Sequence, residues 1–145
     1  MPNVHVNGIS LEYEEFGEKD ATPLLLIMGL GGQMLAWREA ACERLAGRGF
    51  RVIRYDNRDV GLSTKFDEQC PDPGRLIPDV MEGKDVDLPY TLDDMAHDAA
   101  GLLGALGIPA AHIVGASYGG CHCPARCHSP PDPDVDTDLN HVGHQ

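Results

Sequence analysis

Hydrophobic and polar residues alternate along residues 4–16, as they do in a strand that buries one face. This stretch contains Asn7 and Gly8, the dipeptide that favours the type I′ turn of a β-hairpin. The apolar positions on the two sides of the turn are Val4, Val6, Leu11, Tyr13 and Phe16. The pattern therefore predicts a β-hairpin at this point of the chain.

Residues 24–28 are apolar on both faces, which predicts a buried strand of a parallel sheet. Residues 50–55 predict the next strand. Between the two we expect a helix that begins near Leu35 and ends at Gly47 and Gly49, because glycine is frequent where helices stop. Its apolar positions at helical spacing are Trp37, Ala41 and Leu45.

Residues 64–90 are rich in proline, aspartate and glycine and show no clear period. We expect a long excursion from the sheet there, with one short helix near residues 77–82. The clearest helix covers residues 91–107, where Thr91 and Asp94 have the spacing of a capping box. Its apolar stripe consists of Leu92, Met95, Ala99, Leu102, Leu103 and Leu106.

A short strand at residues 112–114 completes a predicted order of β-β-β-α-β-α-β. Strands that alternate with helices favour the α/β class, in which a parallel sheet is covered on both faces. The chain of 145 residues, 42% of them hydrophobic, is long enough for one ordinary domain.

Charge and hydropathy narrow the range of partners. The net charge of -12 argues against a nucleic-acid partner and against an anionic membrane surface. No apolar run reaches membrane-spanning length, and the first residues lack the pattern of a secretory signal. We therefore expect a cytoplasmic protein with no membrane or nucleic-acid partner.

One short motif carries the candidate chemistry. Residues 115–119 match G-x-S-x-G and directly follow a predicted strand. In this motif the serine, Ser117, lies on a sharp strand-to-helix turn, and Gly115 and Gly119 leave room for the helix to fold back. The turn exposes the hydroxyl, and the N–H of Tyr118 can face a developing oxyanion. Ser117 is therefore a candidate nucleophile.

Three blocks of the sequence resemble the N-terminal half of the α/β-hydrolase family, especially the serine esterase branch near the aclacinomycin methylesterases. The blocks are PLLLIMGLGGQMLAW, RVIRYDNRDVGLST and HIVGASYGG. The second is similar to the family's D-x-R-x-x-G-x-S turn, and the third is similar to its nucleophile elbow. The resemblance covers about four-fifths of this chain and about half of a usual domain of the family.

The resemblance implies an incomplete α/β-hydrolase fold, in which a β-hairpin and alternating parallel strands and helices lead up to the elbow. It implies that Ser117 is the nucleophile and that the backbone N–H groups of Tyr118 and Leu30 form the oxyanion hole. Met28 stands where many members have histidine, which changes little because the oxyanion donor is backbone. The residues expected to shape the site are Gly29, Asp56, Arg58, Gly61, Ser63, Gly115 and Gly119. No metal or organic cofactor is implied.

The loop at residues 29–32 also resembles the start of a dinucleotide-binding loop. In G-x-G-x-x-G the sixth position is glycine, whereas Met34 stands there in this chain. A β-hairpin also precedes the strand. Dinucleotide binding is therefore disfavoured.

A nucleophilic serine needs a general base, and the base needs an orienting acid. In this fold both follow the serine along the chain, and the sequence after Gly120 offers neither in a credible context. We therefore expect the triad acid and base to be absent. We expect residues 1–120 to be the N-terminal half of a hydrolase domain and residues 121–145 to be a disordered tail.

The tail has two interpretations. In one, its cysteines and histidines bind a metal, although the spacing C-x-C-x₃-C-H is not usual for zinc. In the other, which we favour, the reading frame has shifted near the codon of Gly120. Codons that encode the tail can also encode, one base later, AIAQRVAIHHPIRMLTLTSIMSDT, which resembles the helix and strand that follow the elbow in family members.

The function expected is hydrolysis of a small-molecule carboxylic ester by a serine nucleophile through an acyl-enzyme. We expect the 145-residue chain itself to be inactive. Thioesterases, lipase-like enzymes, C–C bond hydrolases and cofactor-free haloperoxidases share this half of the fold. Serine at position 117 disfavours the haloalkane dehalogenases, which resemble it but use aspartate there. The alternative from another class is a non-enzymatic fragment whose Cys/His-rich tail binds a metal. The sequence does not indicate an oligomeric state.

Overall fold

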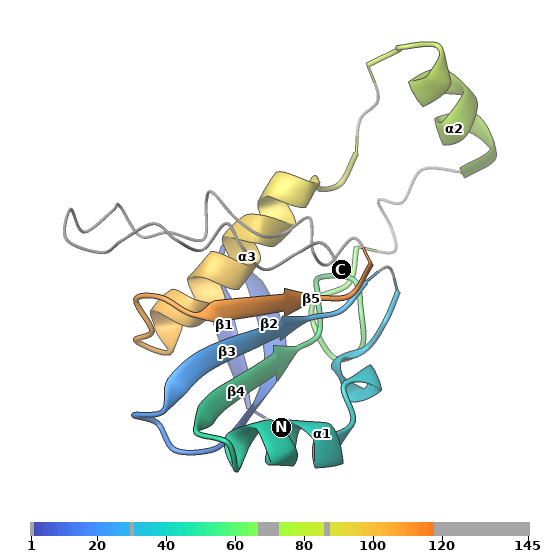
Figure 1. Ribbon diagram of the computed structural model, residues 1–145. Coiled ribbons are helices and arrows are strands. Elements are labelled where there is room, and N and C mark those ends of the chain that lie inside the picture. Colours follow the sequence, from blue (N-terminus) through green and yellow to red (C-terminus); the bar gives the residue numbers. More distant parts are fainter. Residues whose placement is uncertain (1, 30, 67–72, 86–87, 118–145) are drawn as a thin grey trace.

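The fold was analysed in a computed structural model. It describes residues 2–29, 31–66, 73–85 and 88–117. The described strands form a five-stranded sheet in the order β1-β2-β4-β3-β5. Helices lie on both faces of this sheet (Figure 1). The predicted α/β class and the predicted order of elements are confirmed.

The N-terminal strands form the predicted hairpin. Strands β1 (Asn3–Val6) and β2 (Ile9–Phe16) pair antiparallel. Between them Asn7 and Gly8 have φ angles of 51° and 77°, and a type I′ turn requires positive values at both positions. Strand β2 then pairs antiparallel with β4 (Phe50–Tyr55), which joins the hairpin to the central strands.

Strand β3 (Thr22–Ile27) lies between β4 and β5 (His112–Gly115) and is parallel to both. From Leu24 to Ile27 its side chains are buried on both faces because a helix covers each face. Leu25 and Ile27 pack into the cluster beneath α3, whereas Leu24 and Leu26 pack into the cluster beneath α1. This arrangement explains the uninterrupted apolar run in the sequence.

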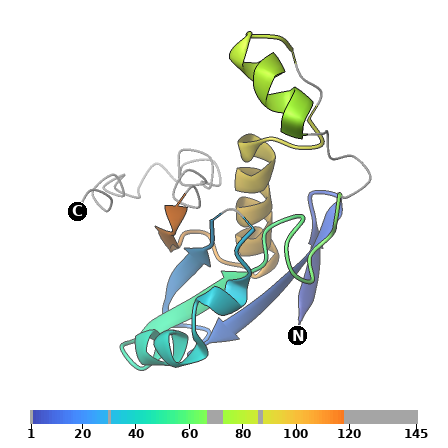
Figure 2. The same ribbon diagram turned by 90° about the vertical axis from the view of Figure 1, so that its right-hand side faces the viewer.

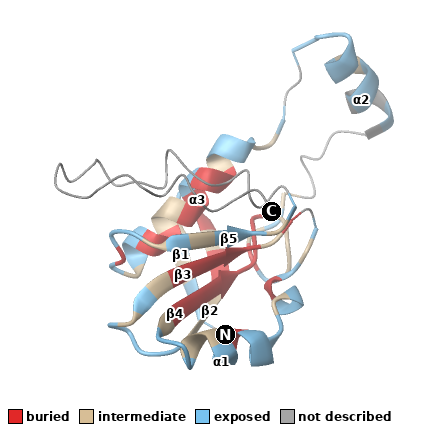
Figure 3. Cartoon of the chain, in the orientation of Figure 1, coloured by how far each residue is buried: buried red, intermediate tan, exposed pale blue. Residues whose placement is uncertain are grey.

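Helix α3 (Leu92–Ala105) begins with the predicted capping box. The Thr91 side chain accepts a hydrogen bond from the Asp94 N–H, and the Asp94 side chain accepts one from the Thr91 N–H. The pKa of Asp94 is lowered chiefly by the latter bond, because it favours the ionised carboxylate. The inward side of α3 is buried against the sheet (Figure 3).

Helix α1 (Glu39–Ala46) covers the other face of the sheet and begins later than predicted. A short 3-10 helix, η1 (Met34–Ala36), occupies the predicted start near Leu35. Trp37 and Arg38 then have extended backbones with ψ of 92° and 138°, so the α-helical pattern cannot start before Glu39.

The excursion after β4 contains helix α2 (Pro73–Met81), which begins before the predicted residue 77. Pro78 lies inside this helix, whereas a helix over residues 77–82 would hold it in the first turn, where proline is tolerated. In two perpendicular views α2 stands clear of the sheet (Figures 1 and 2). None of the helices in the described ranges has the length and apolar character needed to cross a membrane.

Candidate functional site

Ser117 lies two residues after the carboxyl end of β5. The preceding Ala116 N–H donates to the Ile27 carbonyl at 3.0 Å, so the pairing of β5 with β3 continues up to the serine. Ser117 itself has a φ of 55°, in the left-handed region that non-glycine residues rarely adopt. Its side chain is exposed. The strained turn and the exposed hydroxyl are the features expected of a nucleophile elbow.

Gly29, in the loop after β3, packs directly against Ser117. A Cβ atom added at Gly29 would lie 2.8 Å from the Ser117 Cβ, 3.0 Å from the Ala116 carbonyl oxygen and 3.4 Å from the Ser117 Oγ. Only glycine therefore allows this approach. The structure brings together two predicted site residues that are far apart in the sequence. Leu30, Tyr118 and Gly119 lie outside the described residues.

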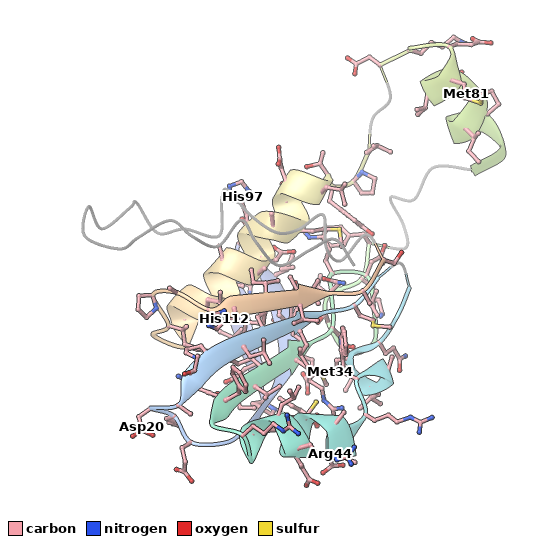
Figure 4. The ribbon with its side chains drawn as sticks, viewed as in Figure 1. Asp20, Met34, Arg44, Met81, His97 and His112 are labelled. Carbon is pink, nitrogen blue, oxygen red and sulfur yellow. The ribbon has the colours of Figure 1, made fainter. Side chains whose placement is uncertain are left out.

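The loop after β3 is held at both of its ends by side chains that follow β4. Asn57 Nδ2 donates to the Met28 carbonyl oxygen at 2.9 Å. At the other end the Met34 N–H donates to Asp56 Oδ1 at 2.8 Å. The loop also has an internal turn, in which the Gly32 N–H donates to the Gly29 carbonyl at 3.1 Å. Met34 is buried and is labelled in Figure 4.

Three further residues of the D-x-R-x-x-G-x-S block come together around Asp56, whose side chain is 3% exposed. Asp56 Oδ2 accepts the Leu62 N–H at 3.1 Å. Gly61 has a φ of 53°, and a Cβ there would overlap the Asp56 carboxylate. Ser63 Oγ donates to the Asp56 carbonyl at 2.7 Å and accepts the Glu12 N–H at 3.0 Å. These contacts fix the turn beside the loop.

Arg58 of the same block forms an ion pair with Asp98 of α3. Its Nε and Nη2 atoms donate to the two carboxylate oxygens at 2.6 and 2.7 Å. The guanidinium also lies 5.4 Å from the ring centre of Phe66 and 5.2 Å from that of Tyr90. Burial opposes the charge of Arg58, but the bonds and charge of Asp98 outweigh it, and the net effect raises the pKa of Arg58. Arg58 therefore fastens the turn to α3.

No hydrogen bond among the described residues reaches the Ser117 hydroxyl. Figure 4 shows His112 at the start of β5, away from the serine end of the strand, and His97 on α3. Both histidines are exposed. Within the described ranges no group of three or more side chains could hold a metal ion. The cysteines and histidines of the tail lie outside those ranges.

Two residues of this framework were not predicted from the sequence. Asn57 falls on the unspecified second position of the D-x-R-x-x-G-x-S block, and nothing in the pattern distinguishes its side chain. Asp98 gave a signal that could have been used, because it lies between Met95 and Leu102 on the apolar stripe of α3. A carboxylate on a buried helix face requires a partner.

Comparison with known proteins places these observations in a family. The sequence model of the alpha/beta hydrolase fold family matches residues 22–132. Rhodomycin D methylesterase DauP of Streptomyces sp. (strain C5) is 36% identical over 111 residues, which cover 77% of this chain and 32% of that protein. Rhodomycin D methylesterase DnrP of Streptomyces peucetius is 34% identical over 111 residues, with the same coverage.

Among solved structures, the enol-lactonase from Burkholderia xenovorans LB400 superposes with a TM-score of 0.63 and 29% identity. The superposition covers 83% of this chain and 39% of that one. The chain thus spans about a third of the length of the curated relatives it matches. By sequence and by fold, the chain belongs to the alpha/beta hydrolase fold family.

Proposed function

We propose that this chain supplies the nucleophile of a serine hydrolase that cleaves small-molecule carboxylic esters. One observation carries the proposal: Ser117 has a φ of 55°, is exposed, and lies against Gly29 at the carboxyl end of the sheet. A buried structural serine would not need a strained backbone, whereas strain is common where a reacting group must be presented. The methylesterase names of the relatives support an ester as the substrate.

In the proposed reaction the Ser117 oxygen attacks the ester carbonyl carbon, and its proton passes to a base. The negative charge that develops on the carbonyl oxygen would be stabilised by backbone N–H groups, which we assign to Tyr118 and Leu30. Collapse of this intermediate expels the alcohol and leaves an acyl-enzyme, which water then hydrolyses. No cofactor takes part in these steps.

The sequence after Gly120 offers neither the base nor its orienting acid in a credible context, so we propose that this chain lacks both. Without them a serine hydroxyl is a weak nucleophile, so the 145-residue chain by itself is expected to show no catalytic turnover.

The proposal is tested by labelling the chain with an activated aryl phosphonate, with and without added imidazole as an external base. Because added imidazole replaces the missing base, modification is expected at Ser117 and is expected to increase with imidazole. Peptide mass spectrometry locates the modified residue, so hydrolysis of the reagent in solution does not interfere. Ser63 is the internal control, since its hydroxyl is buried and hydrogen-bonded.

Modification spread evenly over the serines, or modification that persists unchanged in Ser117→Ala, would contradict the assignment. A hydrolysis rate of an ester that is the same in the parent chain and in Ser117→Ala would confirm the absence of turnover.

We further propose that residues 121–145 are encoded in a shifted reading frame. The support is the compatible codon translation, which has the pattern of an amphipathic helix followed by a strand. Sequencing the gene from the Ser117 codon to well beyond the stop is expected to show that a one-base correction opens a frame containing a later aspartate and histidine. If no one-base correction opens such a frame, the proposed shift is disproved.

A further inference from the structure

The buried side-chain amide of Asn57 is directed at the loop backbone beside Ser117. Asn57 is 2% exposed, and its Nδ2 donates to the Met28 carbonyl at 2.9 Å. Asp56, its neighbour, holds the far end of the same loop. Asn57 therefore acts at the end of the loop that leads into Gly29.

The position of Met28 explains why a side chain is needed there. The parallel pairing of β3 with β4 ends at Leu26 and Arg54, so the Met28 carbonyl lies beyond this ladder. Met28 is half-buried, and a backbone carbonyl that is partly shielded from water is more stable when it accepts a hydrogen bond. Asn57, two residues after the end of β4, supplies with its side chain the donor that the strand no longer supplies.

Holding this carbonyl also fixes the following amide. A peptide unit is planar, and in the trans form the C=O and the next N–H point in opposite directions. The bond from Asn57 thus sets the plane of the Met28–Gly29 peptide. Gly29 is the residue that packs against Ser117, because a Cβ atom added at Gly29 would lie 2.8 Å from the Ser117 Cβ.

We propose that Asn57 is a positioning residue: its side-chain amide fixes the Met28–Gly29 peptide against Ser117 and so sets the backbone that would face the oxyanion. This inference rests on the proposed function for its catalytic meaning. The geometric part, the dependence of Gly29 on Asn57, stands apart from any catalysis and is measurable in the chain as it exists.

The first test uses the unmodified chain labelled with ¹⁵N and ¹³C. A scalar coupling across the hydrogen bond is expected between Asn57 Nδ2 and the Met28 carbonyl carbon. The absence of this coupling, in spectra that show the couplings between β3 and β4, would overturn the proposal without any variant.

The second test compares Asn57→Asp and Asn57→Ala with Asn7→Gly. Asn7 is the control, because its amide also donates to another element, at 2.9 Å to Asp98, but away from the loop, and glycine removes that donor while tolerating the φ of 51° at this position. Both substitutions at Asn57 are expected to shift the Gly29 amide resonance and to speed its hydrogen exchange roughly tenfold, as loss of one hydrogen bond implies. The Gly104 amide in α3 should keep its resonance position and its exchange rate. A general loss of stability would instead speed hydrogen exchange at both amides.

Phosphonate labelling of Ser117 supplies the functional measurement. If Asn57 positions the site, labelling of a folded Asn57→Ala should be roughly tenfold to a hundredfold slower than in the parent chain, because small misplacements of reacting groups are costly. Equal labelling rates in the parent and in Asn57→Ala would overturn the positioning role and leave the proposed function intact. Failure of every form to label would count against the proposed function, and the Gly29 spectra would then decide the positioning alone.

Discussion

At the scale of single residues, the candidate site depends on two close approaches that exclude a side chain. One is Gly29 against Ser117, and the other is Gly61 against the Asp56 carboxylate. The first joins the loop after β3 to the serine turn. The second keeps the turn after β4 tight enough for Asp56 to reach the loop. Neither glycine is explained by turn formation alone.

We predict that Gly29→Ala destabilises the chain by about 1–3 kcal/mol, because the added methyl group must displace the serine turn. Gly104→Ala is the control, since a Cβ at Gly104 has no neighbour within 4 Å. Gly104 is the last but one residue of α3, so that change should stabilise by at most about 0.5–1 kcal/mol, the value for a helix interior. Urea denaturation of both variants measures the difference, and a neutral Gly29→Ala would show that the loop does not press on Ser117.

The sequence predicts these residues unequally. Ser117 and its strained backbone follow from the G-x-S-x-G motif and the strand before it, because the motif specifies a local conformation. The resemblance implied only that Gly29 shapes the site, and its contact with Ser117 was not predicted. The hydrogen bond of Asn57 to Met28 could not be predicted, because it depends on how two loops from different strands meet.

At the scale of elements, one buried carboxylate connects three parts of the fold. Asp98 on α3 accepts two bonds from Arg58 in the turn after β4 and one from Asn7 in the β1–β2 turn. The side chains of Arg58 and Asp98 are 6% and 2% exposed. Two charges so well shielded are stable only as a pair.

We therefore predict that Asp98→Ala lowers the free energy of unfolding by about 3–5 kcal/mol, because it leaves a buried guanidinium without its partner. The exposed pair of Asp79 and Lys84, at 3.0 Å, provides the comparison. Asp79→Ala should cause no measurable change, since exposed pairs are screened by solvent. Equal losses in both variants, measured by urea denaturation, would show that burial of the Arg58 pair is not the cause.

The sequence predicted most helices and strands correctly but misplaced where some helices begin. Strand β4 and the cap of α3 were placed correctly because a strand period and a capping box are local signals. The starts of α1 and α2 were wrong. In α1 a 3-10 turn replaces the first helical residues. In α2 the helix begins at Pro73 and continues through Pro78, which a sequence pattern places in the first turn of a helix.

At the scale of the whole molecule, β5 is the last strand on its side of the described sheet. Its Val114 side chain is 41% exposed, although its partner across the strands, Leu26, is 2% exposed. One face of this strand therefore lacks the cover that the centre of the sheet has. Exposed strand edges with apolar side chains promote association between chains.

We predict that Val114→Lys reduces concentration-dependent light scattering of the purified chain and raises its soluble yield. Added lysine brings the net charge of -12 closer to zero, so an improvement cannot come from stronger charge repulsion between chains. Val80→Lys on α2 is the control, because Val80 is 56% exposed but lies far from the edge. If the two substitutions improve solubility equally, apolar exposure in general, and not the strand edge, causes association.

The parallel pairing of β3 with β5 also has a kinetic consequence. The hairpin of β1 and β2 closes between neighbours in the chain, whereas Leu24 pairs with His112 across most of the described sequence. Closing so long a loop costs entropy before any contact repays it, so such pairs form late in folding. Gly29 and Ser117 thus meet only when the sheet is nearly complete. A nascent or partly folded chain would hold an ordinary serine, and the reactivity proposed for Ser117 would be acquired only in the final step of folding.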